Sequence, residues 1–314
     1  MSESAAIDAA GDALEQTRRA LFPFSFERWL VLGLAAFLDQ CGRGGFGGTL
    51  PTIPPGGGGG GPMGLPESVT APDMERMLPT VALVAAVVVL VILAFVLLAL
   101  WVGSRGIFVY AHCVATGRVE IAAPWRAHAR KANSLFLWRL GLAGAVIAAL
   151  LGIVAAGAAV ALTARGDGPG VAHVAFAVVA MAALFLLVAA ASFGSMALRD
   201  FVAPLQLATG TGCGPAVRLL LDLVRAHPVA FFLYILLKIV LGIVQGVVVL
   251  AAACLTCCVV LLPVVAQTVL QPVFYFERAW PIHLLKRLGH DVTTSDAFRG
   301  YVAASSGISH HPIP

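Results

Sequence analysis

The sequence RGIFVYAHCVATGRVEIAAPWRAHARKANSLFLWR, from Arg105 to Arg139, sets the architecture of this chain. It contains six Lys and Arg residues and a single acidic residue, Glu120. A run of 28 residues without formal charge, Met77–Ser104, precedes it, and a second of 25 residues, Leu140–Ala164, follows it. Each run is long enough to cross about 30 Å of hydrocarbon as a helix. A basic connection between two such runs indicates a transmembrane hairpin whose loop lies in the cytoplasm.

Composition also places much of the remaining chain in lipid. Of its 314 residues, 60% are hydrophobic and only 11% are Asp, Glu, Lys or Arg, whereas soluble domains carry about 25% charged residues. So few charges cannot cover the surface of a soluble protein of this size. The net charge of +4 arises from positive residues in particular loops. This distribution predicts contact with anionic lipid, and no motif points to nucleic acid.

The N-terminal region is predicted to hold a short helix outside the membrane, in residues 1–20, and then a first span at about Phe26–Cys41. The charge-free core of this span, Trp29–Leu38, has only ten residues, which is short for a membrane crossing. The residues before Cys41 are too large for a signal-peptide cleavage site, so the segment is interpreted as an uncleaved span. Gly42–Pro66 contains 12 Gly and 5 Pro and predicts a flexible extracytoplasmic loop.

The fold class predicted for the whole chain is all-α, a polytopic helical membrane protein with about six transmembrane helices and cytoplasmic amphipathic interfacial helices. The 38 uncharged residues from Ile239 to Phe276 would make one helix of about 57 Å, so they must fold back on themselves. Pro124 and Pro215 each lie at the start of a predicted interfacial helix. The five spans after the first are predicted at Pro79–Val102, Leu140–Ala164, Val171–Ser195, Val229–Ala252 and Cys257–Ala279.

The charge distribution fixes the predicted orientation. Of the 20 Lys and Arg residues, 16 fall on one side of these six spans and three on the other, with Lys238 inside a span. The positive-inside rule then places both termini in the cytoplasm and the chain in a bacterial inner membrane. We expect a cytoplasmic N-terminal segment (1–24), a six-span membrane domain (25–285) with a Gly/Pro-rich extracytoplasmic loop (42–76), and a partly disordered cytoplasmic tail (286–314).

One pattern recurs where the chain returns to the cytoplasm: an Arg residue beside aromatic residues. The three occurrences follow apolar hairpins of similar length and predict a hairpin unit of roughly 85 residues that is repeated three times. Residue identity between the units is negligible. The three exits are Arg105…Phe108…Tyr110, Arg199…Phe201 and Phe274-Tyr275-Phe276-Glu277-Arg278.

Four short motifs follow one another along the chain: Pro23-Phe24…Arg28-Trp29-Leu30-Val31-Leu32-Gly33, Ser104-Arg105-Gly106, Pro124-Trp125-Arg126 and Ser134-Leu135-Phe136-Leu137-Trp138-Arg139. In this order they resemble an uncharacterised family of bacterial multi-pass membrane proteins. That family is similar in layout to the membrane domain that precedes the catalytic domain in some glycerophosphodiester phosphodiesterases. The resemblance covers most of residues 21–285 and implies a helical membrane domain without an established chemistry. Because no phosphodiesterase barrel follows the last span, it does not imply that activity.

Five polar residues in or beside the predicted spans could line a path for an ion or a substrate. Each also has a structural interpretation. Asp39 could cap the outer end of the first span, and Lys238 could snorkel to the cytoplasmic surface or pair with Asp200 or Glu277. The glutamines could join helices by hydrogen bonds. The five candidates are Asp39, Lys238, Gln245, Gln267 and Gln271.

The six cysteines are too few for a disulfide scaffold. The predicted topology places Cys41 near the outer surface, together with Cys254, Cys257 and Cys258. A disulfide from Cys41 to one of these three is therefore a candidate, with buried reduced thiols as the default expectation. The three lack neighbouring His, Asp or Glu residues, which argues against a metal site.

The central loop contributes a candidate lipid-contacting face. Its basic residues Arg118, Arg126, Arg130 and Lys131 are expected to meet anionic headgroups on the cytoplasmic side. The predicted helix after Pro124 would present its arginines on one side and its apolar residues on the other.

No sequence pattern points to a reaction. The chain lacks nucleophile, zinc-protease, phosphate-loop and paired-carboxylate motifs, so neither an enzyme activity nor a cofactor is expected. The first hypothesis is a non-enzymatic membrane scaffold or envelope-associated protein that binds lipid or a protein partner. The alternative is a small transporter or permease with a polar path near Asp39, Lys238 and Gln267.

Overall fold

The computed structural model describes residues 5–41, 71–163, 171–256 and 264–293. Every regular element in these ranges is a helix. The Gly/Pro-rich segment predicted to be a flexible loop and the end of the predicted tail lie outside the described residues. The elements are α1 (Ala5–Leu21), α2 (Phe26–Gln40), α3 (Ala71–Thr116), α4 (Ala122–Ala127), α5 (Ala129–Thr163), α6 (Val171–Ala197), the π-helical turn η1 (Leu198–Val202), α7 (Ala203–Thr209), α8 (Cys213–Ala226), α9 (Pro228–Leu255), α10 (Val265–Val269) and α11 (Gln271–Arg287).

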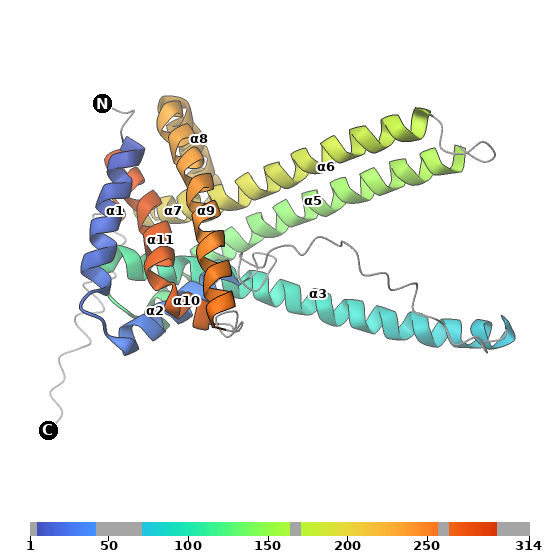
Figure 1. Ribbon diagram of the computed structural model, residues 1–314, viewed down its shortest axis with the longest axis horizontal. Coiled ribbons are helices and arrows are strands. Elements are labelled where there is room, and N and C mark those ends of the chain that lie inside the picture. Colours follow the sequence, from blue (N-terminus) through green and yellow to red (C-terminus); the bar gives the residue numbers. More distant parts are fainter. Residues whose placement is uncertain (1–4, 42–70, 164–170, 257–263, 294–314) are drawn as a thin grey trace, which may run out of the picture.

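The helices form two regions (Figure 1). α1, α2, η1, α7, α8, α11 and the part of α3 after Trp101 pack together into what we call the helical head. From the head, α3 and the α5–α6 hairpin extend to the right, whereas α9 lies across the head in this view. The buried core belongs to the head: Ile107, Phe108, Val109 and Tyr110 of α3 are at most 2% exposed. The extended helices carry mostly exposed apolar side chains.

Four helical segments are long and apolar enough to cross a membrane, judged by length and composition among the described residues. The most apolar windows of these segments bury at most 6% of their residues within the protein, so their apolar surface is available to lipid. This confirms an all-helical chain built for a membrane. The segments are Pro79–Thr116, Ala129–Leu162, His173–Thr209 and Pro228–Leu255.

The first and last predicted spans are not among these four segments. α2 has 15 residues, about 22 Å of helix, which is shorter than the hydrocarbon layer. Residues 257–263 of the last predicted span lie outside the described residues, and the following residues form α10 and α11. α11 continues through Pro281 to Arg287 and buries most of its side chains in the head. The six-span topology therefore stays a prediction.

Two glycines allow α2 to lie directly on α3. A Cβ atom added at Gly106 would overlap the backbone of Leu38 and stand 2.5 Å from the amide nitrogen of Asp39. A Cβ atom at Gly103 would overlap the carbonyl group of Cys41. Backbone contact this close is possible only at residues without a side chain. The Ser104-Arg105-Gly106 motif thus brings the end of α2, and with it Asp39, against α3.

The N-terminal helix α1 is part of the head. It lies beside α11 in Figure 1, where the indole Nε1 of Trp280 donates to the carbonyl oxygen of Ala6 at 2.9 Å. Seven residues later, at the C-terminal end of α11, Arg287 Nη2 lies 2.7 Å from the carboxylate of Asp12. Trp280 is only 2% exposed and fixes the two helices together through its ring as well as its hydrogen bond.

Candidate functional site

Arg199 and Asp200 are buried where α6 ends in the π-helical turn η1. Their exposed fractions are 3% and 0%. A π-helical turn is rare and often occurs at functional positions. Because an unpaired buried charge is very costly, each of these residues requires compensation from nearby groups.

Asp39, at the end of α2, is the main partner of Arg199. The Nη2 atom of Arg199 lies 2.5 Å from Asp39 Oδ2, and its Nε atom donates to the same oxygen at 3.0 Å. Two donors of one guanidinium on one carboxylate make a strong, directional pair. Asp39 is 0% exposed and ion-paired inside the head, whereas its place at the outer end of a membrane span stays a prediction.

Lys238 of α9 joins the same group of charges. Its Nζ atom lies 2.9 Å from Asp200 Oδ2 and 3.0 Å from Glu277 Oε1. The predicted pairing of Lys238 with Asp200 or Glu277 is therefore confirmed, with both acids as partners. The hydroxyl of Tyr234, one helical turn earlier on α9, donates to Asp200 Oδ2 at 2.9 Å.

Arg278 of α11 closes the arrangement from the side of α3. Its Nη2 atom donates to the carbonyl oxygen of Ile107 at 2.6 Å, and Nη1 donates to that of Arg199 at 2.8 Å. Its guanidinium also lies 3.8 Å from Asp39 Oδ1. Burial lowers the pKa of Arg278, and the charge of Asp39 opposes that effect.

These residues form a buried ion cluster with three carboxylates and three basic groups, so its formal charges cancel. Arg199 Nη1 links its two halves by contacting Glu277 Oε1 at 2.9 Å. The members come from α2, η1, α9 and α11, and the cluster therefore holds together helices that are far apart in sequence. The ion cluster consists of Asp39, Arg199, Asp200, Lys238, Glu277 and Arg278.

The predicted polar residues separate into two groups. Asp39 and Lys238 meet in the ion cluster, whereas two glutamines form single interhelical hydrogen bonds. Gln267 Nε2 donates to Gln40 Oε1 at 3.3 Å, and Gln271 Nε2 donates to the hydroxyl of Tyr110 at 3.0 Å. The expected hydrogen bonding between helices is confirmed for these two. Gln245 is half-buried on α9.

A separate arrangement joins residues of different motifs: Arg105 lies between two tryptophan rings. Its Cζ atom is 4.4 Å from the ring centre of Trp101 and 5.4 Å from that of Trp125. On the next helix, Arg139 Nη1 donates to Ser104 Oγ at 3.1 Å. Tryptophan and arginine at one level of two apolar helices are typical of a membrane–water interface. We call the position of these residues the tryptophan level; it comprises Trp101, Arg105, Trp125 and Arg139.

The predicted lipid-contacting face lies on the head side of the tryptophan level. Arg118, Arg126 and Arg130 are exposed, whereas Lys131 is half-buried. The expected single interfacial helix is interrupted at His128, between α4 and α5. Arg126 directly follows Trp125, and Arg130 is the second residue of α5, whose Trp138 is 46% exposed. Among the exposed arginines of the face, Arg126 and Arg130 are nearest in sequence to a tryptophan.

The cysteines carry free thiols wherever the structure describes them. Cys41 is half-buried and Cys254 is exposed, and neither is bonded to another described cysteine. Cys257 and Cys258 lie outside the described residues, so a disulfide from Cys41 to either of them stays a prediction. Burial raises the pKa of Cys41 and raises that of Cys213 to about 12. Among the described residues no group of three His, Cys, Asp or Glu could hold a metal ion.

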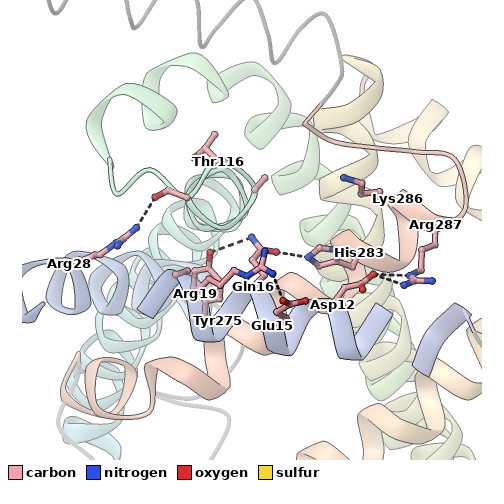
Figure 2. A pocket seen from close by; sticks show the side chains of 13 residues that line it. Asp12, Glu15, Gln16, Arg19, Arg28, Thr116, Tyr275, His283, Lys286 and Arg287 are labelled. Atoms are coloured by element: carbon pink, nitrogen blue, oxygen red, sulfur yellow. Dashed lines mark hydrogen bonds and ion pairs between the residues drawn. The ribbon is translucent and has the colours of Figure 1, made fainter. Parts of the chain in front are cut away.

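A pocket of about 780 Å³ opens on the head between α1, α11 and the end of α3 (Figure 2). Across its floor, His283 Nε2 lies 2.5 Å from Gln16 Oε1, and Gln16 Nε2 donates to the carbonyl oxygen of Val114 at 2.7 Å. None of the predicted polar-path residues lines it. Its charged lining residues are Asp12, Glu15, Arg19, Arg28, Lys286 and Arg287.

Four residues of the ion cluster were not proposed as site residues from the sequence, although two of them, Asp200 and Glu277, were named as possible partners of Lys238. All four lie in the second and third exits of the recurring pattern: Arg199, Asp200, Glu277 and Arg278. Their position next to aromatic residues at the ends of apolar segments was the available signal. Arg105, the arginine of the first exit, does not join the ion cluster and lies in the tryptophan level instead.

The described residues form an all-helical protein with four helices long and apolar enough to cross a membrane and a head joined by buried charges. Over residues 4–287 the sequence matches a family described as a family of unknown function (DUF7544), and the chain belongs to that family. No curated protein and no solved structure matches the chain. The expected membership in an uncharacterised family is confirmed. The resemblance to the membrane domain of glycerophosphodiester phosphodiesterases finds no support in these comparisons.

Proposed function

We propose that this protein is a non-enzymatic scaffold of the bacterial inner membrane whose cytoplasmic head binds anionic lipid headgroups. The exposed arginines beside the tryptophan level carry this proposal. Arg126 is adjacent to Trp125, and Arg130 lies eight residues before Trp138, about 12 Å along α5. The long side chain of arginine can extend toward headgroups from such a position. An arginine close to an anionic membrane surface contributes about 1 kcal/mol of binding free energy.

The ion cluster supports a scaffold because of where its charges lie and how they are paired. Arg278 binds the carbonyl of Ile107, six residues beyond Trp101 on the head side. That separation is about 9 Å along α3, so the cluster lies near the interface rather than at the bilayer centre. Each of its charged groups has an oppositely charged neighbour within 4.0 Å. Such an arrangement fixes the helices of the head in one geometry.

In this proposal, the charges of the loops determine the orientation of the protein in the membrane. The six basic residues of the segment from Arg105 to Arg139 lie on the head side of α3 and α5, which assigns the head and both ends of the chain to the cytoplasm.

A transporter is the second candidate, because Asp39 and Lys238 do converge in the interior of the head. Ionisable groups buried in membrane proteins often belong to ion or substrate pathways. Proton-coupled uptake into vesicles that contain the purified protein, lost in Lys238→Met, would support a transporter over a scaffold.

The lipid test compares the thermal stability of the full chain in uncharged micelles doped with phosphatidylglycerol or with phosphatidylcholine. Phosphatidylglycerol is expected to raise the Tm of the parent, since a ligand that binds only the folded state stabilises it. The double variant Arg126→Gln/Arg130→Gln should lose at least half of that increase. The matched control Arg218→Gln/Arg225→Gln removes the same charge from exposed positions of α8 and should keep it. An equal increase in all three proteins would contradict the proposal.

A further inference from the structure

The pocket between α1, α11 and the end of α3 has the charge pattern of an anion site. The main evidence is the hydrogen bonding of Arg28. Its Nη2 atom donates to the carbonyl oxygen of Gly117 at 3.3 Å, and within the described residues no carboxylate lies at ion-pair distance from it. Gly117 adopts a φ of 68°, a left-handed conformation that suits glycine and ends α3 there. Arg28 therefore has donors left for a ligand.

The other basic groups of the pocket are paired with acids whose side chains are between 19% and 61% exposed. Arg19 pairs with Glu15, Lys286 Nζ lies 3.1 Å from Asp291, and Arg287 Nη2 lies 2.7 Å from Asp12. Exposed ion pairs contribute only about 0–1 kcal/mol each. A ligand with a stronger charge can therefore replace one of these partners at little cost. Figure 2 shows Arg28 at one end of the pocket and Lys286 and Arg287 at the other, with Gln16 between them.

The floor of the pocket is ordered before any ligand binds. Since Gln16 Nε2 donates to the carbonyl of Val114, Gln16 Oε1 is the acceptor in its contact with His283. The network thus assigns the proton to Nε2 of His283. Burial lowers the pKa of His283, which keeps this neutral form at pH 7. Burial also raises the pKa of Tyr275, at the base of the pocket, to about 12, so that residue keeps its hydroxyl proton.

Size and composition narrow the class of ligand. The volume of about 780 Å³ lies within the range of roughly 300–1,000 Å³ that small-molecule sites occupy. A bare inorganic ion would leave most of it empty. The lining side chains comprise four basic and two acidic groups, and Asp291 and Asp8 outside the lining pair with Lys286 and Arg287. An organic molecule with a phosphate group, which carries about two negative charges and several acceptor oxygens, would match the remaining donors of Arg28.

The distance of the pocket from the membrane surface favours a soluble ligand over a lipid. Thr116 at its edge lies 15 residues beyond Trp101, about 22 Å along α3. The headgroup layer extends only about 5–8 Å beyond the hydrocarbon. A lipid seated in the bilayer therefore does not reach the pocket, whereas a dissolved molecule does.

We propose that this pocket binds a water-soluble organic phosphate, with Arg28 as its principal ligand-binding residue. The site is distinct from the lipid-contacting face because Arg126 and Arg130 do not line it.

The test titrates glycerol 3-phosphate into the full chain in uncharged detergent at low salt, with glycerol as the uncharged comparison, by calorimetry. Glycerol 3-phosphate is expected to bind and glycerol is not. Arg28→Gln should weaken binding at least tenfold, while Arg225→Gln, an equal loss of charge on α8, should leave it unchanged. If Arg28→Gln lowers the Tm, Arg19→Gln serves as the second variant, with an expected loss of a few fold. Binding that is absent in the parent, or equal in Arg28→Gln, would overturn the proposal.

A second arm identifies the source of the phosphate. The titration is repeated in nanodiscs of phosphatidylcholine and in nanodiscs that contain phosphatidylglycerol. Equal affinity in both supports a soluble ligand, whereas competition by phosphatidylglycerol would show that a lipid headgroup occupies the pocket and overturn the soluble assignment. The lipid-dependent Tm of Arg28→Gln should remain that of the parent, so this site and the proposed lipid-binding function can fail independently.

Discussion

Arg199 and Asp39 are 160 residues apart in the sequence, yet Arg199 Nη2 lies 2.5 Å from Asp39 Oδ2 in the interior of the head. Both residues are at most 3% exposed. Neither charge is stable in that environment alone, because a buried ion pair compensates a desolvation cost of several kcal/mol per ion. The pair therefore couples the position of α2 to that of η1, and through Arg278 to α3 and α11.

Asp39→Asn should destabilise the head strongly. The amide keeps the size of the side chain but removes its charge and leaves Arg199 and Arg278 with an excess of positive charge. Loss of one member of a buried pair costs about 3–5 kcal/mol, which we expect as a marked fall in the Tm of the detergent-purified chain. Glu15→Gln is the control, since its pair with Arg19 is 61% and 76% exposed, and should change the Tm by little. A Tm for Asp39→Asn equal to that of the control would show that the charges are not coupled.

Gly106→Ala tests the contact between α2 and α3. The added methyl group would overlap the backbone of Leu38 and Asp39, so the helices must separate and the ion cluster must loosen. We expect a loss of at least 2–3 kcal/mol, in the range of overpacking substitutions. Gly141→Ala on α5 provides the matched control, because nothing lies within 4 Å of its Cβ position. There alanine should be neutral or slightly stabilising, since it is the better helix former by about 1 kcal/mol. Equal effects at the two glycines would refute the close contact.

Sequence reasoning identified the apolar helices more successfully than the way in which they pack. The span predicted at Pro79–Val102 lies within α3, and residues 140–163 of the span predicted at Leu140–Ala164 lie within α5, because an uncharged run of that length has few alternatives to a helix. Each observed helix extends beyond the predicted span into the head. Charge alone marks where the hydrocarbon ends, but a helix continues as long as its backbone remains hydrogen-bonded and its side chains find partners.

The ion cluster was only partly predictable for a physical reason. A charged residue beside an apolar run can be stabilised by water at the interface or by an opposite charge in the interior, and the local sequence is the same in both cases. Lys238 was assigned its partners because few acids lie at a similar depth. Asp39 was not assigned its ion-pair partners, because its burial depends on the glycines of α3. That helix begins 32 residues after Asp39 in the sequence.

Arg105→Gln tests the tryptophan level. The substitution removes the positive charge between Trp101 and Trp125, whose ring centres are 6.1 Å apart. A cation over aromatic rings contributes about 0.5–2 kcal/mol, depending on its exposure, and Arg105 is half-buried. We expect a loss of about 1–2 kcal/mol, measured by thermal unfolding in detergent, and a red shift of tryptophan fluorescence as the rings become more exposed. Arg225→Gln, from an exposed pair on α8, should change neither quantity, and an unaltered spectrum in Arg105→Gln would contradict the assigned contact.

His128 makes the stability of the head dependent on pH. It is 6% exposed, and its Nε2 atom lies 3.3 Å from Nδ1 of His112. Burial, with His112 and Lys131 in support, lowers the pKa of His128 from 6.5 to about 3. Between these two values the unfolded chain binds a proton that the folded chain does not, so the stabilising effect of neutral His128 is complete above about pH 6.5. It is lost progressively as the pH falls toward 3.

The expected contribution of His128 between pH 6.5 and 5 is about 2 kcal/mol, because each unit of pKa shift corresponds to about 1.4 kcal/mol. His128→Gln removes the titrating group but keeps a polar side chain of similar reach. Its unfolding free energy should therefore fall less steeply than that of the parent as the pH is lowered from 6.5 to 5, even if it is lower at pH 7. Denaturant unfolding of both proteins across this range measures the difference and cancels the contribution of the carboxylates that they share. His227→Gln, at the junction of α8 and α9, should keep the steep dependence of the parent. Parallel curves for the parent and His128→Gln would mean that His128 is already protonated in the folded head or remains accessible to water there.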